Sequence, residues 1–276
     1  MKGAAETRSA YEMATARAPR RPRSANSLGF SEAVRGIRLV TRRELGAYFD
    51  SGIAYVYTIA FVVLANSIFM NDFFLTGTVD MTGFFALLPL LLASFLPAVT
   101  MRLWAEERRQ RTIELLLTLP IRPSQAILGK YLAALGLFGL FVVGSLPIVV
   151  MLFSLGRPDA GLIVSGYLGL FLLGGLFLAA GMFLSALSGD QIVAFVVTTV
   201  LAFFLVLTGN DKVVAVLDGL APGVAPGTFL RDGVSAIPHY EAFVRGSVDL
   251  ASIVYFVATS AVFLVLNTLV LRRVRT

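Results

Sequence analysis

Long runs without a charged residue alternate with short charged connections along most of the chain. The six longest runs are residues 51–71, 81–101, 131–156, 160–189, 191–210 and 250–271. About 20 apolar residues in an α-helix cross the hydrocarbon core of a bilayer, and a charge at the centre costs about 2.5–3.5 kcal/mol. The runs lack the strict alternation of apolar and polar residues that a membrane β-barrel needs. The pattern therefore predicts an all-α membrane protein with six transmembrane helices.

The composition agrees with a protein that lies in lipid. Of the 276 residues, 57% are hydrophobic and 14% are charged, whereas soluble domains contain about 25% charged residues. This excludes an ordinary soluble enzyme and, despite a net charge of +6, a nucleic-acid-binding domain. Because the chain has no cysteine and only one histidine, His239, it offers neither disulfides nor thiolate or multi-histidine metal sites.

The basic residues predict the orientation in the membrane. Of the 23 Lys and Arg residues, ten lie in residues 1–50, six in residues 102–130 and three after residue 271. Basic connections stay on the cytoplasmic side, so six spans place both termini in the cytoplasm. The largest connection on the other side is the extracytoplasmic loop 211–249, where Pro222 and Pro226 favour short interfacial helices over a seventh span.

Two segments precede the first span. Residues 1–30 are rich in Arg and Pro and predict a disordered basic tail, for which membrane lipid is an expected partner. Residues 31–50 predict an amphipathic helix at the cytoplasmic interface. At 100° per residue its apolar side holds Val34, Ile37, Leu45 and Tyr48.

The connection between the second and third runs predicts a cytoplasmic helix over about 104–118. Glu107 precedes Arg111 by four residues, which is the favourable order for an ion pair on a helix. Ile113 and Leu117 contribute to an apolar side, and Pro120 ends the helix. From charge alone, this helix is equally well interpreted as a solvated connection.

The same connection resembles the signature of ABC-2-type transporter permeases. The resemblance rests on Trp104-Ala-Glu-Glu-Arg-Arg, Thr112-Ile-Glu-Leu-Leu-Leu-Thr-Leu-Pro120 and Leu128-Gly-Lys130. Residues 43–55, 185–194 and 239–255 are similar to that family in matching order, and closest to its gliding-motility and nitrous-oxide-reductase-maturation branch. One departure is Arg111, where the family usually has Gly.

The resemblance implies an ABC-2 (type V exporter-like) permease fold whose residues 104–118 are a coupling helix that docks on a separate ATPase subunit. The residues it assigns to this role are Trp104, Glu106, Glu107, Arg108, Arg111, Thr112, Glu114 and Leu115. It also implies a second permease half, either a homodimer partner or a paralogue, and a bacterial cytoplasmic (inner) membrane location. No G-x-x-x-x-G-K-[ST] motif occurs, so ATP and Mg are expected in the partner ATPase, and no catalytic, cofactor or metal residue is assigned to this chain.

Two other functions compete with this one. Glu106, Glu107 and Arg111 match the E-E-x-x-x-R motif of CAAX-type intramembrane proteases, but that chemistry needs further histidines within the membrane. A non-transporting membrane anchor or scaffold for an extracytoplasmic complex stays open. The loop 211–249 is interpreted as an exit gate, a docking site for an extracytoplasmic accessory protein, or a passive lid.

Overall fold

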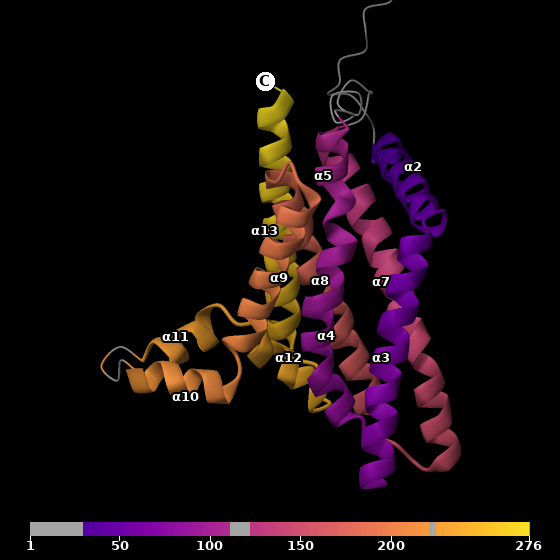
Figure 1. The fold of residues 1–276 in the computed structure, drawn as a ribbon, viewed down its shortest axis with the longest axis vertical. Helices are drawn as coiled ribbons and strands as arrows, with labels where there is room; N and C mark the ends of the chain where they lie inside the picture. The colour runs from indigo at the N-terminus through magenta and orange to yellow at the C-terminus, as the bar shows by residue number, and fades with distance from the viewer. Residues whose placement is uncertain (1–29, 111–121, 221–222, 224, 276) are drawn as a thin grey trace, which may run out of the picture. The chain divides into compact units, whose positions relative to one another are not determined.

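The computed structural model describes residues 30–110, 122–220, 223 and 225–275, and within these residues all regular structure is helical (Figure 1). Residues 1–29, which contain most of the predicted basic tail, lie outside the described residues. The long helices are α2 (Phe30–Phe49), α3 (Gly52–Thr76), α4 (Thr82–Thr100), α7 (Pro123–Leu155), α8 (Ala160–Leu187), α9 (Gln191–Leu207) and α13 (Leu250–Arg275). The short ones are α5 (Arg102–Arg109), α10 (Asp211–Leu220), α11 (Pro226–Gly233) and α12 (Ile237–Val244).

Each charge-free run coincides with a long helix, α3, α4, α7, α8, α9 or α13. Five helical segments of the described residues are long and apolar enough to cross a membrane, and α9 with α10 makes a sixth if that pair, bent by 86°, counts as one span. With 17 residues, α9 alone lies at the lower limit for a spanning helix. The main difference in bounds is α7, which begins at Pro123, eight residues before the predicted run.

Helix α8 lies at the centre of the bundle and contacts α4, α7, α9, α12 and α13. Glycines on α8 allow its neighbours to approach closely. A Cβ added at Gly174 would lie 2.3 Å from Cε1 of Phe138 on α7, and one at Gly181 would lie 2.8 Å from Cβ of Thr100 on α4. A side chain at either position therefore requires the neighbouring helix to move.

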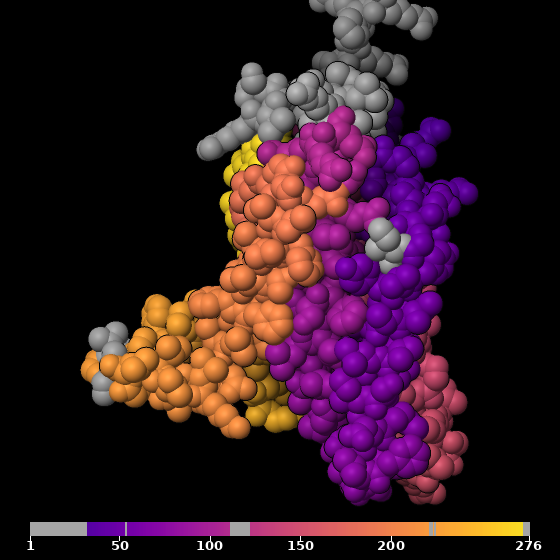
Figure 2. Space-filling view, in the orientation of Figure 1, coloured from indigo at the N-terminus to yellow at the C-terminus, as the bar shows by residue number. Residues whose placement is uncertain are grey.

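The predicted loop 211–249 contains α10, α11 and α12, and these helices differ in burial. No residue of α10 is buried, and the α10–α11 hairpin projects from the side of the bundle (Figure 2). Helix α12 instead packs on α8 and α4, with Tyr240 and Phe243 almost completely buried. Short interfacial helices were predicted for this loop, but α12 belongs to the core.

One end of the bundle collects the connections that the sequence predicts to be cytoplasmic. Helix α5 and the C-terminal end of α13 both lie at this end (Figure 1). The turn between α8 and α9, residues 188–190, lies there too, because α5 contacts both of these helices. We call it the basic end of the bundle below.

Candidate functional site

Helix α5 continues from α4 after a single turn residue, Met101, and lies at the basic end of the bundle. Its inner side is buried and holds Leu103, Trp104 and Ala105, whereas Arg109 and Gln110 are exposed. Apolar residues cover the bundle while the end of α5 at Arg109 and Gln110 faces outward, which is the distribution expected of a short helix that lies on a protein surface.

A single hydroxyl group joins α5 to the central helix. The Oγ atom of Ser185 on α8 accepts hydrogen bonds from the backbone N–H groups of Trp104 and Ala105, both at 3.2 Å. The same hydroxyl donates to the backbone oxygen of Met101 at 3.0 Å. All three contacts are at the junction of α4 and α5, so a displacement of this junction acts directly on α8.

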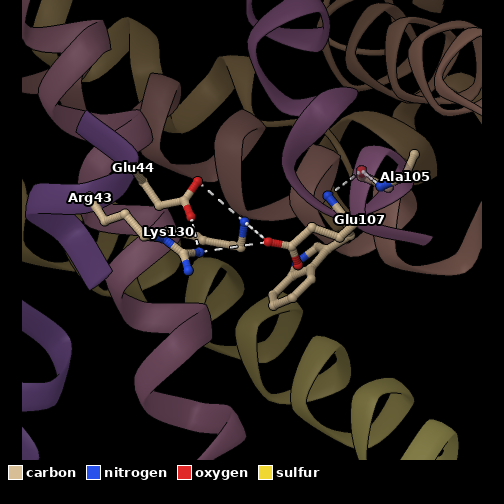
Figure 3. Close-up of polar contacts among 7 residues, drawn as sticks. Arg43, Glu44, Ala105, Glu107 and Lys130 are labelled. Carbon is tan, nitrogen blue, oxygen red and sulfur yellow. Dashed lines mark hydrogen bonds and ion pairs between the residues drawn. The ribbon is translucent and has the colours of Figure 1, made fainter. Parts of the chain in front are cut away.

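A buried ammonium group joins α5 to two other helices (Figure 3). The Nζ atom of Lys130 on α7 lies 2.9 Å from Oε1 of Glu107 on α5 and 3.3 Å from Oε2 of Glu44 on α2. Only 2% of the Lys130 side chain is exposed, and its Nζ lies 5.0 Å from the centre of the Trp104 ring. We call Arg43, Glu44, Glu107 and Lys130 the charge cluster.

The charge cluster balances two cations with two carboxylates. Arg43 forms an ion pair with Glu44 and lies 3.7 Å from Glu107, and its side chain is half exposed. Burial raises the pKa of the Glu44 carboxyl, but Lys130 and Arg43 together outweigh that effect and hold the pKa below its usual value. Glu44 is therefore ionised at neutral pH, as the ion pair with Lys130 requires.

Close packing of α2 on α7 explains how Glu44 reaches Lys130. A Cβ added at Gly129 would lie 2.6 Å from Cβ of Val40, so only glycine admits α2 at this distance. The N-terminal turn of α7 is stabilised by Oε1 of Gln125, which accepts a hydrogen bond from the backbone N–H of Arg122 at 3.1 Å. These contacts fix the orientation of Lys130 between α2 and α5.

A comparison with known families agrees with the all-helical membrane fold. The family described as ABC-2 family transporter protein matches residues 71–269. The chain belongs to this family. No curated protein matches the chain. As an ABC-2 transporter permease, it is a multi-pass membrane protein with several apolar helices, and the match includes α5, α7 and α8.

The structure describes half of the predicted coupling residues. Trp104 is fully buried, with the Lys130 ammonium group over its ring. Glu106 is partly exposed and accepts a hydrogen bond from the Gln110 side chain. Glu107 forms ion pairs within the chain, and Arg108 is partly exposed. Arg111, Thr112, Glu114 and Leu115 lie outside the described residues.

Three residues of this permease site have a role that sequence reasoning did not assign. Lys130 was interpreted as the charge at which the third run opens, and Glu44 as part of the amphipathic segment. Ser185 was named only as the first residue of the segment 185–194 that resembles the family. The sequence did contain a signal for Lys130. When the helix begins at Pro123, this charge lies two turns inside α7 and not at its end.

Proposed function

We propose that this ABC-2 permease is an exporter subunit that receives force from a separate ATPase through residues 104–118. The observation that carries the proposal is the pair of links from α5, one to α8 through Ser185 and one to α7 and α2 through Lys130. A partner that moves α5 acts on three helices at once. A solvated connection would need neither link.

The chemistry of ATP hydrolysis belongs, in this proposal, to the partner. That subunit holds ATP and Mg, while the permease supplies no catalytic residue and no cofactor site. A second permease half, either an identical copy or a paralogue, completes the transporter in a bacterial cytoplasmic membrane. The resemblance of residues 43–55, 185–194 and 239–255 supports the gliding-motility and nitrous-oxide-reductase-maturation branch.

The absence of cysteine allows a direct test of docking. Gln110→Cys places one thiol at the exposed end of α5, and Ser154→Cys places one near the exposed end of α7 as a control. Each variant is treated with a photoactivatable thiol cross-linker in native membranes, and cross-linked partners are identified by mass spectrometry. We expect Gln110→Cys to capture an ATP-binding subunit and Ser154→Cys not to capture it.

A second experiment separates docking from folding. Arg109 is exposed, whereas Glu107 belongs to the charge cluster. Arg109→Glu is expected to reduce co-purification of the ATPase while thermal stability stays unchanged. Glu107→Lys is expected to reduce both the co-purification and the thermal stability. If no ATP-binding subunit is captured or co-purified under conditions in which the permease stays folded, the anchor or scaffold replaces the transporter proposal.

A further inference from the structure

Two cavities of different chemistry adjoin at the C-terminal end of α2, and Tyr48 lines both of them. The larger, with a volume of about 440 Å³, lies between α3 and α7, and we call it the apolar groove. The smaller, with a volume of about 200 Å³, lies between α2, α5 and α7, and we call it the polar pocket. An apolar cavity and a charged cavity therefore share Tyr48 as part of their walls.

The walls of the apolar groove are almost entirely hydrocarbon. They include Ile59 and Val63 of α3, and Leu140 and Val143 of α7. The polar groups at its edge are the hydroxyls of Tyr48, Tyr55 and Thr58. A groove of this kind suits an acyl chain, which needs apolar contact along its length and no hydrogen-bond partner.

The polar pocket contains one cation and one carboxylate that the charge cluster does not use. Lys130, Glu44 and Glu107 line the pocket, but they form ion pairs with one another. Arg102 and Glu106 also line it, and neither forms an ion pair with any other described residue. The Arg102 guanidinium donates a 3.4 Å hydrogen bond from Nη1 to Oγ of Ser51.

The depth of the polar pocket is that of a lipid headgroup. Arg102 is the first charged residue after the charge-free run 81–101, and Ser51 immediately precedes α3. A charge at the end of a spanning helix lies at the interface, where phosphate and ammonium groups of lipids lie too. The groove then extends from this depth along α3 into the hydrocarbon region.

We propose that this site binds one membrane phospholipid with a phosphoethanolamine headgroup. One acyl chain occupies the apolar groove, the phosphate faces Arg102, and the ammonium group faces Glu106. Arginine forms paired, charge-assisted hydrogen bonds with phosphate, and a primary ammonium donates to a carboxylate. Glu106 accepts a hydrogen bond from Gln110, but an anionic lipid without an amine offers it no cation, so the pocket favours a headgroup that carries both charges.

The bound lipid connects α2, α3 and α5 at the basic end of the bundle. Its binding depends only on this chain and does not rest on the proposed docking of an ATPase. The lipid site and the coupling proposal therefore fail or succeed separately.

The test measures bound lipid on the purified full chain. The protein is delipidated in detergent and titrated with dioleoyl-phosphatidylethanolamine or dioleoyl-phosphatidylglycerol, and bound lipid is counted by native mass spectrometry. We expect one phosphatidylethanolamine per chain, with at least about a tenfold preference over phosphatidylglycerol, which corresponds to 1.4 kcal/mol. Equal binding of both lipids, or stronger binding of phosphatidylglycerol, overturns the proposal.

Variants locate the lipid in the two cavities. Arg102→Gln is expected to weaken the binding of both lipids about tenfold. Glu106→Gln is expected to remove the preference for phosphatidylethanolamine without weakening the binding of phosphatidylglycerol. Val63→Trp fills the apolar groove and is expected to reduce the binding of both lipids. Val56→Trp, at an exposed position of α3 outside the groove, is its control. The preference is a ratio within each sample, so a misfolded fraction does not change it. Retention of the full preference in Glu106→Gln overturns the assignment.

Discussion

Helices α5 and α12 each contain eight residues and each pack against α8, yet different forces hold them. Helix α5 is fixed by the charge cluster and by the hydroxyl of Ser185. Helix α12 is fixed by buried aromatic side chains and by two buried hydrogen bonds at 2.8 Å. The Tyr240 hydroxyl donates to the backbone oxygen of Phe85, and the Ser165 hydroxyl on α8 donates to the backbone oxygen of Phe243. Apolar burial does not depend on charge state, whereas an ion-paired junction changes when a partner, a proton or salt changes its charges.

This contrast suits the two positions in the bundle. Gly169 of α8 approaches α12 so closely that an added Cβ would lie 2.5 Å from Cβ of Phe243. Such packing leaves α12 only one position. The ion pairs of the charge cluster constrain the position of α5 less, because they require only that the charges stay near one another. We therefore expect an external partner to act on α5.

The largest expected effect is the loss of apolar packing at α12. Phe243→Ala removes a fully buried ring and is expected to lower the free energy of unfolding by about 3–5 kcal/mol. Thermal unfolding in detergent measures it. Phe229→Ala, at an exposed position of α11, is the control and is expected to change stability by no more than about 0.5 kcal/mol. Equal effects of the two variants would contradict the assignment of α12 to the core.

The next effect breaks the charge cluster. Lys130→Met leaves two partly buried carboxylates without their shared cation. We expect it to lower the free energy of unfolding by about 3 kcal/mol. The triple variant with Glu44→Gln and Glu107→Gln removes the repulsion and is expected to recover most of the stability. Lys130→Met with wild-type stability would show that the cluster does not hold α5.

A smaller effect compares single hydroxyl groups at the two helices. Ser185→Ala removes three hydrogen bonds at α5 and is expected to cost about 1–3 kcal/mol. Tyr240→Phe removes one bond at α12 and is expected to cost about 1 kcal/mol. Ser94→Ala, exposed on α4, is the control for a serine that bonds only within its own helix. A larger loss for Tyr240→Phe than for Ser185→Ala would reverse the comparison.

The smallest effect is the response to acid. Because the pKa of Glu44 is lower in the folded chain than its usual value of 4.5, the folded state binds the proton less well than the unfolded state. Its contribution to stability is complete above the usual value and is lost as the pH falls through the lowered pKa. We expect wild type to lose this contribution below about pH 4.5 and Glu44→Gln to lack that part of the acid response, as thermal unfolding from pH 7 to pH 3 will measure. An unchanged acid response in Glu44→Gln would contradict the lowered pKa of Glu44.

Prediction from sequence succeeded where lipid imposes a simple rule. A charge in hydrocarbon is costly, so charge-free runs had to coincide with the long helices, and α4 and α8 begin within one residue of their runs. The rule did not identify the role of Lys130, because this charge is tolerated by pairing with Glu44 and Glu107 from other helices. It also gave no sign that α12 is buried, since eight residues with one proline are too short for a periodic signal.

The sequence by itself determined the membrane environment, the positions of the spanning helices and the similarity to ABC-2 permeases, because each depends on local composition or on a contiguous motif. The tertiary structure alone decided that Glu107 faces Lys130 inside the chain, that Ser185 bonds to the start of α5, and that Tyr48 lies between an apolar groove and a polar pocket. Those contacts join residues far apart in the chain, and their free energy depends on burial and distance, which only the packed helices define.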